Sequence, residues 1–493
     1  MQQKTNPFEV SVGSGKLATP GYFFLALVII LVSAWLIGNE GVDVGLGLLA
    51  LPFILIYFYW LFQKPIIGLY TAIALGFLLL GIPRYFKSIT QVGMAMDGIL
   101  FLTYIALIFK KFREKVDWTP AKKDITLLSA IWFGYAIFQF FNPEVQDRQA
   151  WLAGMRGIAL YMMLIVPLVL LFIDNMKKLN VFFYVWGVFS ILATLKGIMQ
   201  FTIGVDPWEK AWLDGGGAVT HIIFGKLRIF SFLSDAALFG STQGYAAVVF
   251  SIMALGEKNW KRRLFFLLVA LLAFFGMFIS GTRGAISVPL GGFFLYFILR
   301  KNWYVMISGF VLLAVVYIFF KYTTIGQDNQ QIRRMRSAFD PNDPSLQIRL
   351  ANQKKLSIYL ASRPFGGGIG HAGVKAQRYL PNAFLSQVAT DSWYVLIWAE
   401  QGIVGLALHL FILFYIMIKA SYLIMKKIRD PVLKMKMTAL ASGMMGIMIA
   451  SYGNAALGTM PTGMLIYVSM ALMLNSAYLD KQIQSSNIDN EPQ

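Results

Sequence analysis

The chain contains about 14 apolar runs of roughly 17–25 residues, and these runs restrict its fold more than any other feature. A helix of that length crosses about 30 Å of hydrocarbon. A chain that spans a membrane must satisfy its own backbone hydrogen bonds, and long runs with little alternation favour helices over a barrel. We therefore predict an all-α polytopic membrane protein. The predicted spans are 21–37, 44–62, 66–82, 91–109, 125–141, 157–173, 181–203, 229–255, 264–280, 285–299, 303–320, 392–418, 436–453 and 460–479.

Composition supports this class. Hydrophobic residues make up 57% of the chain and charged residues 14%, against about 45–50% and about 25% in soluble domains. A net charge of +19 would suggest nucleic acid in a soluble protein. Here short basic loops that set the topology account for it, so we expect no nucleic-acid partner. The absence of cysteine is compatible with an oxidising compartment but does not indicate one.

The loops between the predicted spans give an orientation. Five short basic loops, at 110–123, 174–178, 257–263, 300–302 and 426–436, all fall on the cytoplasmic side if both termini are cytoplasmic. We expect a single transmembrane domain over 1–493, with cytoplasmic tails at 1–20 and 480–493. The N-terminal tail shows no cleavable signal, so the first span is expected to direct insertion. The outer face then receives 142–156, 204–228, 280–285 and 321–391.

The outer loop 321–391 is unusually long, and loops of that size are functional or disordered. Its sequence predicts a helix over 344–362, with Asp343 as N-cap, Pro344 as the first helical residue and Pro364 as a stop. We expect this amphipathic helix to lie on the membrane surface. Its apolar stripe comprises Leu346, Leu350, Leu356, Tyr359 and Leu360.

Several basic residues fall at the outer ends of predicted helices: Arg156, Arg228 and Arg283, with Arg84 and Lys87 beside the third span. Long basic side chains can simply extend to the interface. The outer face is nevertheless the wrong side for arginines that set topology, so an anionic partner is the alternative. A planar guanidinium binds two phosphate oxygens at once.

Two of these arginines have informative neighbours. Asp235 follows Arg228 by seven residues, so both are expected on nearly one face of the eighth span. The pair either balances charge locally or forms a ligand site with an acidic neighbour. Arg283 lies between Gly281 and Gly284, and these glycines permit a tight turn and close approach of backbone or ligand.

Asp391 precedes the twelfth span in "TDSWYVLIWAEQGIVG". It could be the N-cap of that helix. Alternatively it is a carboxylate at the outer mouth of the bundle that faces the arginines and takes a proton from an attacking hydroxyl. Glu400 is about half a turn out of phase, so we interpret it as a packing or helix–helix polar contact. Asp97 is a further intramembrane carboxylate, with Arg84 or Lys196 as its expected partner.

The glycine-rich stretch "RPFGGGIGH" (363–371) follows no strand and lacks a Walker lysine, which argues against nucleotide binding. It is either a backbone nest for an anion or a flexible loop. The three histidines, His221, His371 and His409, are far apart, and His409 is expected inside a span. We therefore predict no catalytic metal and no cofactor.

Three stretches, in this order, resemble the O-antigen ligase/polymerase family of bacterial membrane glycosyltransferases. They are "RIFSFLSDAALFGSTQGYAA", "SGTRGA", and "RPFGGGIG" leading into "TDSWYVLIWAEQGIVG", and together they cover roughly 225–410. The resemblance implies a site at the periplasmic face of the bacterial inner membrane. It implies transfer of a glycan from undecaprenyl diphosphate to a lipopolysaccharide core or to another lipid-linked repeat, by an inverting and metal-independent reaction.

The resemblance also implies roles for residues. Arg228 and Arg283 match the arginines that hold the diphosphate. Asp391 stands where ligases usually carry the histidine of a His-Asn pair; the pair here is Asp-Ser (391–392), which leaves a carboxylate as the base and favours a polymerase or a ligase for another surface polysaccharide. Arg349 and Arg156 are expected to extend the cationic surface. The remaining candidates for substrate binding are Asp235, His371 and Tyr394.

An alternative function is a transporter or flippase for an anionic lipid or solute. Transporters often show internal repeats, broken helices and a site at mid-depth. The chain shows no repeat, and only Asp97 and Lys196 favour this alternative. A structural scaffold is disfavoured by the charges predicted within the bundle. A cavity fixed at the outer face would support transfer.

Overall fold

The computed structural model describes residues 42–85, 92–112, 116–223, 225–340 and 342–488, with scattered positions between 24 and 38. The predicted span 21–37 is described only at scattered positions, and the predicted tail 1–20 and Lys87 lie outside the described residues. The chain divides into two compact units, Met1–Pro65 and Ile66–Gln493. In the first unit the structure describes α2 (Val42–Gln63).

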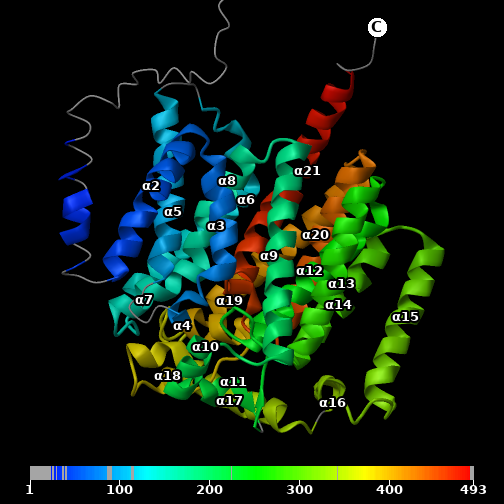
Figure 1. Cartoon of the computed structure of the whole chain (residues 1–493). Helices are drawn as coiled ribbons and strands as arrows, with labels where there is room; N and C mark the ends of the chain where they lie inside the picture. The colour runs from blue at the N-terminus through cyan, green and yellow to red at the C-terminus, as the bar shows by residue number, and fades with distance from the viewer. Residues whose placement is uncertain are drawn as a thin grey trace, which may run out of the picture. The chain divides into compact units, whose positions relative to one another are not determined.

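The second unit is built almost entirely from helices (Figure 1). Its α-helices are α3 (Ile66–Leu78), α4 (Ile82–Tyr85), α5 (Gly93–Lys111), α6 (Asp124–Phe138), α7 (Arg148–Met155), α8 (Tyr161–Phe172), α9 (Met176–Thr202), α10 (Pro207–Trp212), α11 (Ala218–His221), α12 (Ala236–Gly256), α13 (Trp260–Ile279), α14 (Ser287–Leu299), α15 (Trp303–Tyr322), α16 (Gln330–Arg336), α17 (Pro344–Leu360), α18 (Phe384–Gln387), α19 (Trp393–Lys426), α20 (Pro431–Ala450) and α21 (Thr462–Ile488).

Short 3-10 or π turns and one hairpin complete the second unit. The turns are η2 (Thr119–Ala121), η3 (Gln139–Phe141), η4 (Arg156–Leu160), η5 (Leu213–Gly217), η6 (Arg283–Ile286), η7 (Ser337–Phe339), η8 (Val374–Arg378) and η9 (Ala456–Gly458). Strands β1 (Ile222–Ile223) and β2 (Lys226–Leu227) pair antiparallel, with Ile222 opposite Leu227.

The prediction of an all-α polytopic membrane protein is confirmed. Within the described residues, ten helices are long and apolar enough to cross a membrane, and three shorter apolar helices lie at Gly47–Gln63, Ile66–Leu78 and Arg283–Leu299. Together they account for every predicted span after the first. Several bounds differ. The span predicted at 157–173 runs from Arg148 to Phe172, through α7, η4 and α8, and the last helix continues to Ile488 through much of the predicted tail.

The centre of the second unit is α12, which packs against α9, α13, α14 and α20. Nearly all of its residues are buried. Close approach is possible because small residues lie at the contacts. A β-carbon at Gly244 would stand 3.1 Å from the Val288 β-carbon, and one at Gly292 would stand 2.8 Å from the Val248 side chain. Small residues bring transmembrane helices together in this way when lipid supplies no hydrophobic drive.

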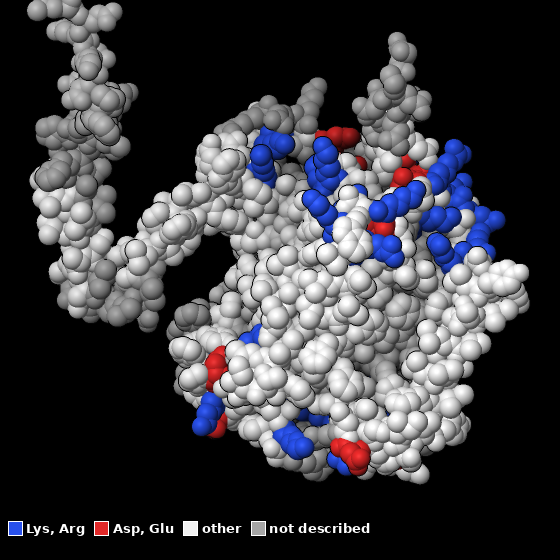
Figure 2. Space-filling view, turned by 45° about the vertical axis from the view of Figure 1, so that its right-hand side comes forward, with Lys and Arg blue, Asp and Glu red and all other residues white. Residues whose placement is uncertain are grey.

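The two ends of the second unit differ in character. The short helices α4, α10, α11, α16, α17 and α18 gather at one end, drawn at the bottom of Figure 1, while α21 ends at the other. Figure 2 shows lysine and arginine side chains crowded at the upper end of the face it presents. The predicted topology requires the short basic loops to lie at one end of the bundle and the long loops with their short helices to lie at the other. Which end faces the cytoplasm stays a prediction.

The long loop predicted at 321–391 is folded. The predicted helix at 344–362 is confirmed as α17, in which Asp343 caps the first turn by accepting a hydrogen bond from the Leu346 amide at 3.1 Å and Pro344 is the first helical residue. Of its predicted apolar stripe, Leu356 and Leu360 are buried. The helix therefore packs against the protein along part of its length.

Candidate functional site

A cavity of about 530 Å³ lies at the end of the second unit that carries the short helices. Its walls come from the segment before α12, the turn at 281–284, α16, α17, the loop before α19 and the turn after α20. It brings together side chains from distant parts of the sequence. The charged residues that line it are Arg228, Asp235, Arg283, Arg334, Arg349, Lys375 and Asp391.

Arg228 and Asp235 stand at the two ends of a non-helical segment. The prediction that both project from one helix is wrong, because α12 begins only at Ala236. Asp235 caps α12, accepting hydrogen bonds from the Leu238 amide at 2.9 Å and the Ser234 hydroxyl at 2.7 Å. The Nε of Arg228 is buried without a hydrogen-bond partner in the described chain. Burial lowers the pKa of Arg228, nearby Asp235 opposes this shift, and the positive charge of Arg283 adds to it.

Arg283 forms most of its contacts with the outer loop. It forms an ion pair with Asp343, and it donates hydrogen bonds to the hydroxyls of Ser337 at 3.2 Å and Ser345 at 2.7 Å. Gly281 has φ +57°, as the predicted tight turn requires. The same Asp343 side chain caps α17, so one carboxylate joins the 281–286 turn to the start of that helix.

Arg334 was not recognised from the sequence. It projects from α16 into the cavity, and it makes no ion pair with any described residue. Burial lowers its pKa, and the positive charges of Arg228 and Arg283 lower it further. The available signal was the stretch "QQIRRMR", because arginines this dense on an outer loop serve no topological purpose.

Asp391, the candidate general base, lines the cavity on the loop before α19. Asp391 is 51% exposed and pairs with the Nε of Arg349 on α17 at 3.1 Å. The prediction that Asp391 caps the twelfth span is wrong: Ser392 is the N-cap, and its hydroxyl accepts from the Val395 amide at 3.5 Å. The alternative expectation, an acidic group at the cavity mouth beside arginine, matches this position.

Three predicted site residues do not line this cavity. Arg156 pairs with Asp97 at 3.0 Å, so the predicted partners of Asp97, Arg84 or Lys196, are wrong. The Tyr394 hydroxyl donates to the carbonyl of Met448 at 2.8 Å. These contacts hold helices together. Lys196 pairs instead with Asp206 at 2.6 Å and Glu209 at 3.3 Å.

His371 is the third, and it is a buried structural residue. Its Nε2 accepts hydrogen bonds from the Gln146 and Asp147 amides at 3.0 and 3.1 Å, and its Nδ1 lies 2.9 Å from the carbonyl of Ile369. Burial lowers the pKa of His371. This arrangement fits a neutral imidazole that donates from Nδ1 and fixes the loop beside α7.

The glycine-rich stretch 363–371 is packed against a break in α19 and is not an open nest. The Gly368 amide donates to the carbonyl of Glu400 at 2.9 Å, and the Val404 amide donates to that of Pro364 at 3.3 Å. Glu400 is buried, and its Oε1 accepts from the Ala372 amide at 3.4 Å. Glu400 therefore makes the predicted packing contact, and it makes it with this loop.

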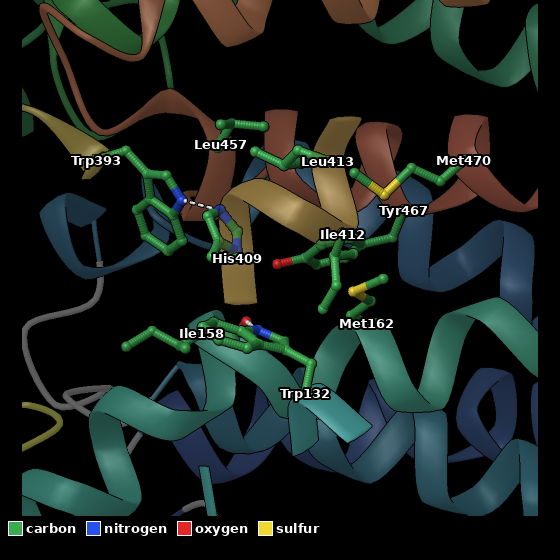
Figure 3. A pocket seen from close by; sticks show the side chains of 10 residues that line it. All are labelled: Trp132, Ile158, Met162, Trp393, His409, Ile412, Leu413, Leu457, Tyr467 and Met470. Carbon is green, nitrogen blue, oxygen red and sulfur yellow. Dashed lines mark hydrogen bonds between the residues drawn. The ribbon is translucent and has the colours of Figure 1, made fainter. Parts of the chain in front are cut away.

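A second cavity, of about 10 Å³, lies inside the bundle (Figure 3). Apolar and aromatic side chains, mostly from α6, α8, α19 and α21, surround it. A cavity of this volume can hold no molecule larger than water. As predicted, His409 is buried within a span; its Nε2 accepts a hydrogen bond from the Trp393 indole at 2.9 Å. The size of this cavity excludes a substrate.

In the described part of the chain, no three His, Cys, Asp or Glu residues group closely enough to hold a metal ion. The absence of a catalytic metal stays a prediction.

Two comparisons with known proteins agree on what the chain is similar to. Residues 268–410 match the family model described as O-antigen ligase. The chain is also 24% identical over 333 residues to an O-antigen polymerase of Salmonella muenchen, an alignment that covers 64% of this chain and 80% of the relative. Both comparisons support the O-antigen ligase/polymerase family, which the sequence resembles. The chain is a multi-pass membrane enzyme of the glycosyltransferase type, as the resemblance implied.

The O-antigen ligase match contains most of the cavity wall. Arg283, Arg334, Arg349 and Asp391 all lie inside residues 268–410, and Arg228 lies before them. The part of the chain that matches the family model is therefore also the part that contributes most of the charged lining.

Proposed function

We propose that this enzyme transfers a glycan from undecaprenyl diphosphate to an acceptor sugar at the periplasmic face of the bacterial inner membrane. Arg228, Arg283 and Arg334 hold the diphosphate, and Asp391 is the general base. The observation that carries the proposal is the convergence of these groups, from separate elements, on one cavity of about 530 Å³. A cavity of this size accommodates a headgroup together with sugar residues.

The charges of the cavity suit an anionic leaving group. Five cations and two carboxylates line it, which leaves three positive charges in excess. A diphosphate diester is negative on both phosphates and gains a further charge when its bond to the sugar breaks. Fixed arginines placed where that charge develops can supply the stabilisation by electrostatics alone.

The reaction proposed is a single displacement. The acceptor hydroxyl oxygen attacks the anomeric carbon, the bond from that carbon to the diphosphate oxygen breaks, and its electron pair leaves with the diphosphate. The hydroxyl proton passes to the Asp391 carboxylate, which Arg349 holds in place. Attack opposite the leaving group inverts the anomeric centre.

The location of the cavity also bears on the alternative function. A transporter is expected to bind its substrate at mid-depth. This cavity is lined instead by outer-loop segments and helix ends. That arrangement favours transfer over transport.

The test is glycan transfer in vitro from purified undecaprenyl-diphosphate-linked glycan, with a chelator present. Lipid-linked repeats and lipopolysaccharide core are offered as acceptors in separate reactions, which distinguishes a polymerase from a ligase. Arg334→Ala should reduce transfer at least tenfold, and the matched control Arg333→Ala, which removes an exposed arginine from the same helix, should not. Near-normal transfer by Arg228→Ala, Arg283→Ala and Arg334→Ala would overturn the proposal.

A further inference from the structure

The segment 229–235 joins two charged groups of the cavity, Arg228 and Asp235. It is neither helix nor strand, and yet most of it is buried. Ser231 has φ +56°, a left-handed conformation that is unusual for a residue with a side chain. A buried, irregular segment keeps one shape only if other groups satisfy its backbone. Those groups therefore determine where Arg228 and Asp235 point.

Arg84 of α4 supplies the largest set of these contacts. Its guanidinium donates to the carbonyls of Ser231 at 3.2 Å and Ser234 at 2.8 Å, and also to that of Leu233. The side chain is only 4% exposed. One rigid fork thus fixes three carbonyl oxygens of the segment that ends at Asp235.

The guanidinium of Arg84 is also enclosed by rings. Its carbon lies 4.7 Å from the ring centre of Trp212 and 4.3 Å from that of Phe230. Burial lowers the pKa of Arg84 to about 10, so the group stays charged at neutral pH. In the described chain it forms no ion pair with a carboxylate. The sequence predicted that Arg84 lies at the outer end of a helix, and an anionic partner was one explanation for it. In the structure Arg84 binds backbone carbonyls instead.

Gln200 of α9 binds the same segment from the other side. Its Oε1 accepts from the amides of Phe230 at 3.3 Å and Ser231 at 2.8 Å, and its Nε2 donates to the carbonyl of Ser231 at 3.1 Å. The hydroxyl of Ser231 donates to the carbonyl of Ala193 at 2.7 Å. The segment is therefore held at its middle by α9 and along its second half by α4.

Arg228 itself receives no such support through its side chain. Its backbone amide donates to the carbonyl of His221 at 2.8 Å, but its Nε is buried without a partner. Its orientation toward the cavity depends on the path of the backbone that follows. A change in that path would move Arg228 and Asp235 together.

We propose that Arg84 is a positioning residue for diphosphate binding, which acts through the 229–235 segment to aim Arg228 and Asp235 into the cavity without touching the substrate. This inference rests on the proposed function, because it takes Arg228 as a diphosphate ligand. Lysine cannot replace Arg84 fully, since one ammonium group lacks the planar fork that reaches three carbonyls.

The test is a double-mutant cycle on binding, which does not require turnover. Affinity for undecaprenyl diphosphate in detergent is measured for the full-length protein and for Arg84→Gln, Arg228→Ala and the double variant. Arg84→Gln alone should weaken the affinity about tenfold. In a protein that already carries Arg228→Ala, the same substitution should weaken the affinity further by less than about threefold. Lys210→Gln, which removes an exposed cation from α10, is the matched control and should bind normally.

Thermal unfolding in detergent accompanies each measurement. If Arg84→Gln does not fold, the cycle is run with Arg84→Lys and with Gln200→Ala, which loosens the same segment from α9. The positioning role would be overturned if the losses of affinity caused by the Arg84 and Arg228 substitutions simply multiplied in the double variant. It would also be overturned if Arg84→Gln, Arg84→Lys and Gln200→Ala all folded and bound undecaprenyl diphosphate normally. Normal binding by Arg228→Ala would instead refute the assignment of Arg228 in the proposed function.

Discussion

The break in α19 at Gly402 offers the sharpest test of how the 363–371 loop, which leads into the cavity wall at 372–375, is held. Gly402 has φ 66° and ψ −168°, a conformation that residues with a β-carbon essentially never adopt. The carbonyls of Ala399 and Glu400, three and two residues before Gly402, accept hydrogen bonds from the amides of Gly367 and Gly368. We predict that Gly402→Ala destabilises the protein and abolishes glycan transfer.

The magnitude follows from two effects. Forcing alanine into this region costs about 1–3 kcal/mol. A β-carbon there would also stand 2.5 Å from the Gly366 amide nitrogen, so the 363–371 loop must move away. The hydrogen bonds between that loop and α19 then weaken, at about 1 kcal/mol each. We expect a total loss of roughly 3–5 kcal/mol in the free energy of unfolding.

The assay is thermal unfolding in detergent together with glycan transfer. The matched control is Gly134→Ala on α6, where a β-carbon meets nothing within 4 Å. Alanine in a helix interior is favoured over glycine by about 0.5–1 kcal/mol, so this control should unfold at or above the normal temperature. A Gly402→Ala protein with unchanged unfolding and unchanged transfer would refute the reasoning, because the loop would then not depend on the break.

Three further predictions concern single groups. Asp391→Asn should lower kcat about 10²–10⁴-fold with little change in KM, measured by transfer kinetics, because it removes the proposed base but not the diphosphate ligands. Asp343→Ala should lower the free energy of unfolding by about 1–2 kcal/mol, because it removes the cap of α17. Asp343→Ser keeps a capping side chain and should restore most of that stability. Both variants remove the ion pair between Asp343 and Arg283. Burial lowers the pKa of His371 in the folded protein below its ordinary 6.5, so below that pH the unfolded chain binds more protons than the folded chain. The stability that the neutral imidazole contributes is therefore complete above pH 6.5 and is lost as the pH falls below it. The unfolding temperature of His371→Gln should accordingly depend less on pH.

The helical framework could be predicted because its causes are local. Apolar runs of sufficient length define the spans, and an aspartate followed by proline defines the start of α17. Arg228 and Arg283 were singled out because arginines on the predicted outer side do not set topology, and Asp391 because it would face them there. Their convergence on one cavity required the fold.

The failures share a physical cause, which is that tertiary contacts decided between locally equivalent options. Asp391 and Ser392 are both good N-caps, and Arg349 on a distant helix takes the first and leaves the second to cap α19. The apolar stretch 229–233 reads as part of a span, but Arg84 and Gln200 hold it outside the helix. Pattern along the chain carries no information about such partners.

The distribution of partners among the arginines suggests an order of binding within the cavity. Arg283 and Arg349 already form ion pairs with carboxylates, whereas Arg228 and Arg334 form none with any described residue, and the positive charge of Arg228 lowers the pKa of Arg334. Like charges held together in a half-buried site repel, and an anion between them relieves that repulsion. A diphosphate should therefore first bind between Arg228 and Arg334, without separating an existing pair. Arg228 lies on the segment before α12 and Arg334 on α16, so a diphosphate bound between them would bridge these two elements.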